Sequence, residues 1–428
     1  MADELLVGAA EVDITPPVGT ALAGSTRPRT SVGTDDPLTA KAIVVESGGV
    51  ALAYVLLDLI KLYRKEGDLA CQLAAERTGI AADHIVWAAS HTHTGPYTGS
   101  IMGSEEGGID AEWLAAVPGK FAAAVEQAHA ARRPARMSRL RGYCHGIAAN
   151  RRLKFKGGRE LNTWLLHKGE DELQCLGSAG PVDPEVGILC FDDARENPIA
   201  VLWHYTLHTN TNFGPRFSAD YPGVVAARLR ERFGTGVVPI FLPGAFADIN
   251  TPGPRYREVG DRLADAIIGQ LNGRQPRSGE VALGALKEEV VVPYRDLTVD
   301  QDQRIRESQW PPETQEVFRR EVEIMRKQGE TEATTVIQAW RIGEVGFASL
   351  PGELFVEWGL KLKAESPFPW TYPVELGGDY LGYLVTHQAW AGGGYESLIA
   401  RSARPSPDGV AKMTDVALGL LGRLWQGG

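Results

Sequence analysis

The sequence predicts an α/β protein with a mixed β-sheet core and flanking helices, because two kinds of apolar pattern alternate along it. Short runs typical of buried strands occupy Ala40–Val45, Val50–Leu57 and Ile85–Ala89. Helical stretches, Glu66–Thr78 and Ala111–Ala131, alternate with them. Such alternation is typical of layered α/β folds. The hydrophobic content of 43% and the charged content of 23% indicate a packed globular protein.

The alternation continues in the second half of the chain. Strand patterns cover Val186–Phe191, Ile199–His204, Val237–Leu242 and Val345–Leu350, and a helical pattern covers Pro222–Phe233. Polar residues that are unusual for a core stand at the ends of these strands. Because the active sites of open α/β sheets lie where strands end, the sequence predicts a site that is assembled from distant segments.

The segment between residues 300 and 335 differs in composition from the rest. It is rich in Arg, Glu and Gln, and Trp310-Pro311-Pro312 interrupts it. Charged helical faces are usually plain solvent-exposed surface, and a lid over a site is the functional alternative. We expect one domain over residues 1–428, with a helical excursion or lid at 300–335.

Composition also limits the partners and the location. The formal net charge of −10 argues against nucleic acid as a partner. The start of the chain lacks the pattern of a secretion signal, and no window has the apolar length of a membrane span, so we expect a cytoplasmic protein without integral membrane association. The four cysteines are widely spaced, which indicates reduced thiols. The sequence leaves the oligomeric state open, a homo-oligomer included.

A pair of histidines closes one of the predicted strands, in Ser90-His91-Thr92-His93-Thr94-Gly95-Pro96. Residues two apart in extended backbone face the same side, so His91 and His93 can point into one cavity. Gly95-Pro96 then ends the strand. Imidazole is the commonest metal ligand, so the pair indicates a metal or catalytic site, although paired histidines are also found as ordinary hydrogen-bonded residues.

Three later segments place further polar groups beside apolar strands: Trp203-His204-Tyr205-Thr206-Leu207-His208, Leu350-Pro351-Gly352-Glu353 and Tyr380-Leu381-Gly382-Tyr383-Leu384-Val385-Thr386. In this order, and with Val12-Asp13-Ile14-Thr15-Pro16-Pro17 near the start, the chain resembles the neutral ceramidase family, zinc amidases that cleave N-acylsphingosines. The resemblance covers nearly the whole chain. It rests on the order of the motifs, since no single motif decides it, and it implies a ceramidase-like catalytic domain.

The resemblance also implies a set of metal ligands. The family positions fall on His91, His208, Glu353 and Tyr383, with Zn²⁺ as the cofactor. His204 competes with His208, and we prefer His208 because it lies just past the strand. Two imidazoles and a carboxylate with one open position suit a catalytic zinc, whereas a tyrosine ligand is unusual.

His93, Arg151 and Tyr395 match the family residues that surround the substrate amide. The implied mechanism is attack by zinc-bound hydroxide, stabilisation of the oxyanion by donors from these side chains, and proton transfer to the leaving nitrogen by His93. Arg151 could instead neutralise a substrate carboxylate. The next residue, Arg152, could also be the one that faces the cavity.

Two departures from the family affect the expected substrate. Gly244, in Leu242-Pro243-Gly244, stands where the ceramidases carry a serine, which excludes a serine nucleophile at that position. The ceramidases also have a secretion signal and continue into an immunoglobulin-like C-terminal domain, and this sequence has neither. We therefore expect a compact intracellular relative that acts on a small soluble molecule, which makes ceramide a doubtful substrate.

Two aspartates near strand ends each have a second interpretation. Asp220, in Ser218-Ala219-Asp220-Tyr221-Pro222, either caps the following helix or holds the second ring nitrogen of a histidine, and capping is favoured. Asp58 follows a predicted strand and is a candidate for the same supporting role.

The leading hypothesis is thus a zinc-dependent hydrolase of an amide bond in a small-molecule substrate. An ester or a lactone remains open as the substrate, because the same groups serve any acyl transfer. A non-haem iron oxygenase with two histidines and one carboxylate is the alternative from another reaction class, against which Tyr383 argues. A binding protein that has lost catalysis is the third hypothesis, motivated by Gly244.

Overall fold

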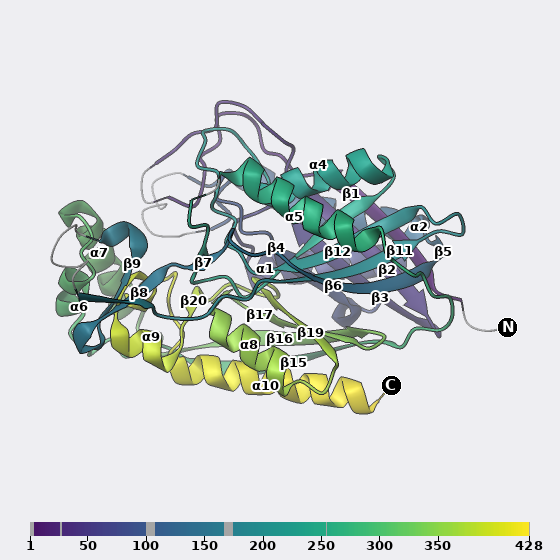
Figure 1. Cartoon of the computed structure of the whole chain (residues 1–428). Coiled ribbons are helices and arrows are strands. Elements are labelled where there is room, and N and C mark those ends of the chain that lie inside the picture. Colours follow the sequence, from purple (N-terminus) through teal and green to yellow (C-terminus); the bar gives the residue numbers. More distant parts are fainter. Residues whose placement is uncertain (1–3, 26–27, 100–107, 167–173, 254, 428) are drawn as a thin grey trace.

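The predicted strands and helices are present in the computed structural model, which describes residues 4–25, 28–99, 108–166, 174–253 and 255–427. Helices flank several mixed sheets (Figure 1), so the predicted fold class is confirmed. The predicted helices correspond to α1 (Arg64–Thr78), α2 (Ala111–Ala130) and α4 (Tyr221–Phe233).

The first of the larger sheets in the described residues has the strand order β4-β3-β2-β1-β5. Its members are β1 (Leu6–Asp13), β2 (Thr39–Ser47), β3 (Val50–Leu57), β4 (Ile85–Ala89) and β5 (Arg133–Pro134). The neighbours β1, β2 and β3 are antiparallel, and β4 joins β3 in parallel. Both β2 and β3 are almost wholly buried.

Two further sheets repeat this arrangement of an antiparallel part and one parallel edge strand. The second has the order β13-β12-β11-β6, from β6 (Arg136–Tyr143), β11 (Glu185–Asp192), β12 (Pro198–Tyr205) and β13 (Val238–Pro243). The third has the order β15-β16-β17-β19, from β15 (Leu283–Pro293), β16 (Glu332–Ile342), β17 (Val345–Leu350) and β19 (Trp370–Glu375). The parallel pairs are β12 with β13 and β17 with β19.

The parallel edge strand of each sheet is reached through a helix, as parallel connections require. These helices are α1 between β3 and β4, α4 between β12 and β13, and α8 (Val356–Glu365) between β17 and β19. The three edge strands β4, β13 and β19 contact one another. The carboxyl ends of strands from all three sheets therefore meet in one region.

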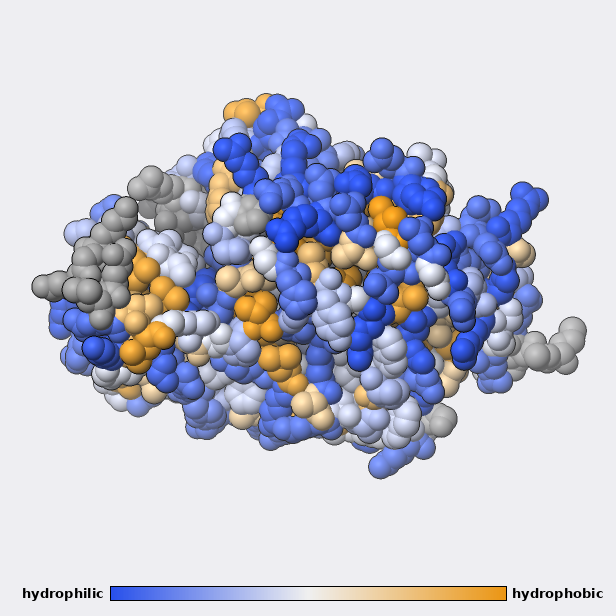
Figure 2. Space-filling model, in the orientation of Figure 1, coloured by the Kyte–Doolittle hydropathy of each residue, from blue (hydrophilic) through white to orange (hydrophobic). Residues whose placement is uncertain are grey.

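Helices also cover the outer faces of the second and third sheets. Helices α4 and α5 (Tyr256–Leu271) pack on the second sheet, and α10 (Pro407–Gln426) packs along the third (Figure 1). The face seen in Figure 2 is largely hydrophilic, with short groups of hydrophobic residues between charged ones. None of the described helices has both the length and the apolar character that a membrane crossing needs.

Short elements lie around the strand ends. They are β7 (Ala149–Asn150) with β14 (Ile249–Asn250), β8 (Arg152–Phe155) between β9 (Glu160–Asn162) and β10 (Cys175–Ser178), β18 (Glu353–Leu354) with β20 (Tyr383–Leu384), and α9 (His387–Gly392). The 300–335 segment forms α6 (Gln301–Glu307) and α7 (Pro312–Gln328). One face of this pair is buried, with Ile305 and Phe318 packed against Leu398. Its role as a lid, like the single domain over 1–428, stays a prediction.

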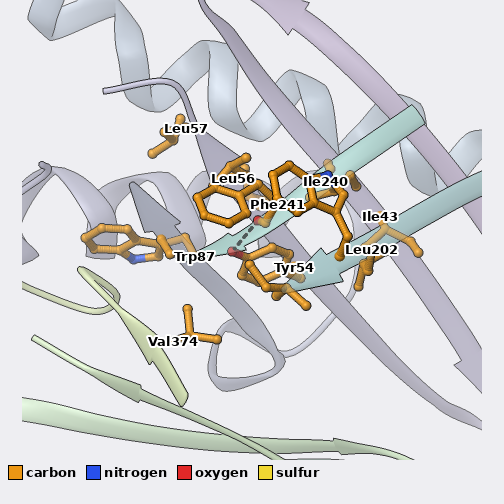
Figure 3. Packing of buried hydrophobic residues seen from close by; sticks show 14 of the residues in the cluster. Ile43, Tyr54, Leu56, Leu57, Trp87, Leu202, Ile240, Phe241 and Val374 are labelled. Carbon is orange, nitrogen blue, oxygen red and sulfur yellow. Dashed lines mark hydrogen bonds between the residues drawn. The ribbon is translucent and has the colours of Figure 1, made fainter. Parts of the chain in front are cut away.

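One tyrosine links the three larger sheets in the core. Tyr54 of β3 is fully buried, and its hydroxyl donates to the backbone carbonyl of Phe241 in β13 at 3.2 Å (Figure 3). Its ring stacks on Trp340 of β16, with 5.9 Å between the ring centroids. Tyr54 therefore contacts both other sheets.

We expect Tyr54→Ala to lower the free energy of unfolding by about 3 to 5 kcal/mol, as aromatic truncations in cores do. Tyr54→Phe keeps the ring and loses one hydrogen bond, at a cost of about 1 kcal/mol. Tyr143, which is 59% exposed, offers the control: Tyr143→Ala should change stability by about 0.5 kcal/mol or less. Denaturant unfolding measures all three, and equal midpoints for Tyr54→Ala and the unmodified protein would contradict the assignment.

Candidate metal centre

The side chains that the sequence singled out lie where strands of the three sheets end. His91 and His93 follow β4, His208 follows β12, and Glu353 follows β17. Tyr383 reaches the same place by pairing: Glu353 and Tyr383 are direct register partners in the parallel pair of β18 and β20. The architecture thus brings together residues that are far apart in the sequence.

His91 sits on strained backbone. Its φ of 67° lies in the left-handed region, which is unfavourable for a residue with a side chain and is often found at functional sites. The conformation is held by its backbone N–H, which donates to the Leu59 carbonyl at 2.8 Å, and by its Nδ1, which lies 2.6 Å from the Ile60 carbonyl oxygen. Because a carbonyl only accepts, Nδ1 carries a proton, and in the neutral ring Nε2 has the free lone pair.

His93 is oriented in the same way from the other side. Its Nδ1 lies 2.8 Å from the Gly24 carbonyl oxygen, so its Nε2 is also left as an acceptor in the neutral ring. Gly24 has a φ of +83°, and a Cβ there would lie 2.5 Å from the His93 ring. Only glycine allows this approach.

His208 completes a cluster of three imidazoles. Its Nε2 lies 3.1 Å from that of His93, and one ring nitrogen from each of His91, His93 and His208 lies within 4.8 Å of the others. The Nδ1 of His208 has an acceptor, the Phe246 carbonyl, and a donor, Arg151, both at 3.4 Å. A metal on Nε2 requires the tautomer in which Nδ1 donates to Phe246.

Glu353 faces this cluster with one oxygen held and one not. Tyr380 donates to Oε1 at 2.7 Å. Oε2 is buried and has no aligned hydrogen bond within the described part of the chain, although His91 Nε2 lies 3.4 Å away. Burial by itself would raise the pKa of this carboxyl, but His91, Tyr380 and Arg151 outweigh burial and lower the pKa to about 2. An ionised carboxylate therefore faces a ring nitrogen across a gap that suits a cation.

Arg151 holds the other side of the centre. Its guanidinium donates to the Tyr383 hydroxyl at 3.2 Å and to Asn250 at 3.3 Å. Its Nε donates to Glu396 at 2.8 Å, and both Arg151 and Glu396 are buried. Burial, together with the charge of Glu353, raises the pKa of Tyr383 well above its ordinary value. A phenolate at Tyr383 would thus need a nearby cation.

These groups share one cavity of about 460 Å³. The three histidines, Glu353, Arg151, Tyr383 and Tyr395 all line it, together with Trp164, Phe213 and Trp310. Burial and the neighbouring His91 lower the pKa of His93 to about 3, so its ring is neutral at neutral pH. The cavity therefore combines a cluster of metal-ligating atoms with hydrogen-bond donors and aromatic walls.

Two solved ceramidase structures have a similar fold. Neutral ceramidase from Pseudomonas aeruginosa superposes with a TM-score of 0.75 and 18% sequence identity, over 98% of this chain and 74% of that one. A ceramidase complexed with C2 also superposes with a TM-score of 0.75, at 17% identity over 99% of this chain and 75% of the other. The chain has the neutral ceramidase fold.

The resemblance inferred from motif order is thereby confirmed at the level of the ceramidase fold. Comparisons with models of protein families and with curated protein sequences found no match. At identities this low, a shared ceramidase fold does not by itself carry over a substrate or a reaction. Those must be argued from the residues of the site.

Two choices between neighbouring residues can be judged against the geometry. His204 is buried outside the cavity, where its Nε2 contacts the Pro373 carbonyl at 3.1 Å and its ring packs on Tyr372. Arg152 also points away from the cavity and pairs with Glu160 at 2.7 Å. His208 and Arg151 are the members of each pair that line it.

Gly244 lies in tight packing outside the cavity. A Cβ at this position would lie 2.5 Å from Thr206 Oγ1 and 3.0 Å from His204 Nε2. A serine would not fit here without displacing its neighbours. Gly244, which the motif order places at the position of the family serine, therefore allows close packing against residues 204–206 at the end of β12.

The two aspartates have supporting roles in the scaffold. Asp220 caps α4 by accepting from the backbone N–H of Tyr221, as expected, and also accepts from the N–H groups of Thr211 and Asn212, which fixes the loop after His208. Asp58 accepts from the Lys41 ammonium at 2.7 Å rather than from a histidine.

Sequence reasoning missed several residues around the cavity. Tyr380 orients Glu353, Glu396 orients Arg151, and Gly24 allows the position of His93. Tyr380 and Glu396 adjoin singled-out residues in the sequence, in Tyr380-x-x-Tyr383 and Tyr395-Glu396, which was the available signal. Gly24 gave none, and the signal for Trp310 was the lid alternative for residues 300–335.

Glu396 provides a test of this support. Its carboxylate accepts from Arg151, from Arg152 at 2.5 Å and from Asn162 at 2.8 Å, all buried. Glu396→Gln removes the negative charge that pairs with the buried guanidinium groups of Arg151 and Arg152. We therefore expect the free energy of unfolding to fall by about 3 to 5 kcal/mol. Glu288→Gln breaks the exposed pair with Arg423 and should cost about 0.5 kcal/mol or less. Similar denaturation midpoints for the two variants would refute this role of Glu396.

Proposed function

We propose that this protein is a zinc-dependent hydrolase that cleaves an acyl bond, an amide in the first instance, in a small molecule. The observation that carries the proposal is a buried cluster of ligating atoms: ring nitrogens of His91, His93 and His208 lie within 4.8 Å of one another, and the buried Oε2 of Glu353 lies 3.4 Å from His91 Nε2. When the His91 ring is neutral, its Nε2 and the carboxylate oxygen are two facing acceptors, which is unfavourable in a buried site unless a cation lies between them. The ceramidase fold gives independent support.

The donor set fits a zinc ion. We assign its ligands as His91, His208, Glu353 and Tyr383, a mixture of nitrogen and oxygen donors that zinc accepts. The carbonyls of Ile60 and Phe246 would fix the ring orientations through Nδ1, and Tyr380 would fix the carboxylate. When bound, zinc acts as a Lewis acid that activates water and polarises an acyl carbonyl.

The chain's own side chains supply the remaining steps. Tyr395 and Arg151 are donors to the oxygen of the scissile carbonyl, where each such donor contributes about 3 to 4 kcal/mol to transition-state stabilisation. Burial raises the pKa of Tyr395 above its ordinary value, so its hydroxyl stays protonated and able to donate. We assign the proton transfer to His93, which would take a proton from the attacking water and pass it to the leaving nitrogen.

Metal content tests the ligand set. We expect about one zinc per chain in protein purified without chelators, and its loss in His91→Ala, His208→Ala and Glu353→Ala. His204→Gln removes a buried histidine outside the cavity and should retain the metal. His93→Ala separates two arrangements: retained zinc agrees with its role in proton transfer, whereas lost zinc makes His93 a ligand. Iron in place of zinc would favour the oxygenase alternative.

Hydrolysis tests the reaction. We expect the zinc-loaded protein to release the amine from short N-acyl compounds, and Tyr395→Phe to lower kcat about 100-fold with zinc retained, because an oxyanion donor is lost. Hydrolysis of the matching esters, compared with that of the amides, measures how the rate depends on the leaving group. Full turnover by metal-free His91→Ala protein would refute the mechanism. No turnover of amide or ester by fully loaded protein would leave a binding scaffold as the better account.

A further inference from the structure

The helical excursion forms a fixed wall of the cavity. Trp310, between α6 and α7, lines the cavity although the segment looks like charged surface in the sequence. Glu321 of α7 is buried and accepts from the Arg401 side chain at 2.6 and 2.9 Å. On α6, Arg304 donates to the Trp390 carbonyl at 3.0 Å and lies over that ring. These contacts anchor both helices beside the candidate metal centre.

Aromatic rings gather on this side of the cavity around Tyr395. The ring centroids of Tyr383, Trp310 and Trp164 lie 5.3, 5.7 and 6.2 Å from that of Tyr395, with interplanar angles of 70° to 73°. Phe213 lies at the side of His93, with 6.2 Å between centroids. These are edge-to-face geometries, which leave ring faces and edges available to another aromatic group.

Trp310 also carries an unused hydrogen bond. Its Nε1–H is buried and has no partner within the part of the chain that the structure describes. Buried indole N–H groups usually have a hydrogen-bond acceptor. The Nε1–H of Trp310 is therefore available to an acceptor atom on a ligand. Trp164 and Phe213, which line the same cavity, are 43% and 60% exposed, which is high for large aromatic side chains in general. An unpaired donor and exposed rings in one cavity point to a ligand.

We propose that the site takes substrates that carry a compact aromatic group beside the scissile acyl bond, with Trp310 and Tyr395 as the residues that determine this specificity. The inference rests on the function proposed above. The cavity of about 460 Å³ lies in the lower part of the range for small-molecule sites, about 300 to 1,000 Å³, and part of it surrounds the metal cluster. An acceptor atom on the substrate pairs with Trp310 Nε1.

Binding and hydrolysis are measured separately so that the two proposals can fail separately. Calorimetry with phenylacetamide and with dodecanamide measures binding. Hydrolysis is followed for acetyl, phenylacetyl and dodecanoyl amides of one small amine, and for N-acetylbenzylamine, which places the ring on the amine side. We expect the better of the two aromatic amides to exceed the dodecanoyl amide at least tenfold in kcat/KM, and phenylacetamide to bind more tightly than dodecanamide.

Variants of Trp310 test whether this residue causes the preference for an aromatic substrate. Trp310→Ala should lower phenylacetamide affinity about tenfold, and should lower the ratio of kcat/KM for the preferred aromatic amide to that for the acetyl amide by a similar factor. Trp310→Phe keeps an aromatic ring and should retain most of the preference, because these amides carry no acceptor other than the scissile carbonyl. Trp425→Ala, at a half-exposed tryptophan on α10, is the control and should match the unmodified protein.

Tighter binding of dodecanamide, or the same aromatic preference in Trp310→Ala, overturns the inference. If no amide or ester is cleaved by zinc-loaded protein, the proposed function fails, and the preference for an aromatic ligand is then decided by the binding measurements alone.

Discussion

The site depends on the contact between the edge strands β4, β13 and β19, which brings three sheets together. His91 and His93 follow β4, and His208 and Glu353 follow β12 and β17, the strands that pair with β13 and β19. A slip of one residue in any of these strands would turn its side chains to the opposite face. The buried Tyr54, which touches β13 and β16, helps to fix the distance between the sheets. The precision of the centre is therefore a property of the whole core.

Unfavourable local features concentrate at the centre. His91 has left-handed backbone, the buried Oε2 of Glu353 has no aligned hydrogen bond in the described residues, and the Nε2 atoms of His93 and His208, 3.1 Å apart, would both be acceptors if His208 donates its Nδ1–H to Phe246. Each such feature costs about 1 to 3 kcal/mol and persists only where the surroundings impose it. A cation at the centre would relieve the last two at once. This is why the geometry supports a metal site more strongly than the residue types alone.

The sequence could predict the fold class because periodicity and strand ends are local properties. His91 and His93 share one motif, and their proximity follows from extended backbone. The proximity of Glu353 and Tyr383 does not follow from either segment, because it depends on the pairing of β18 with β20. Trp310 was not singled out for another reason: α6 and α7 bury only one face, so the charged residues on the other face dominate the composition.

The neutral ceramidase fold and the walls of this cavity carry different kinds of information. The fold fixes where strand ends meet, and Gly244 lies in tight packing outside the cavity. The substrate is decided by what surrounds the metal-ligating atoms, and here that is a set of rings centred on Tyr395. Because Tyr395 also stands beside Tyr383, a ring held by Trp310 and Tyr395 would lie next to the reacting carbonyl. Recognition and chemistry would then act through the same side chain.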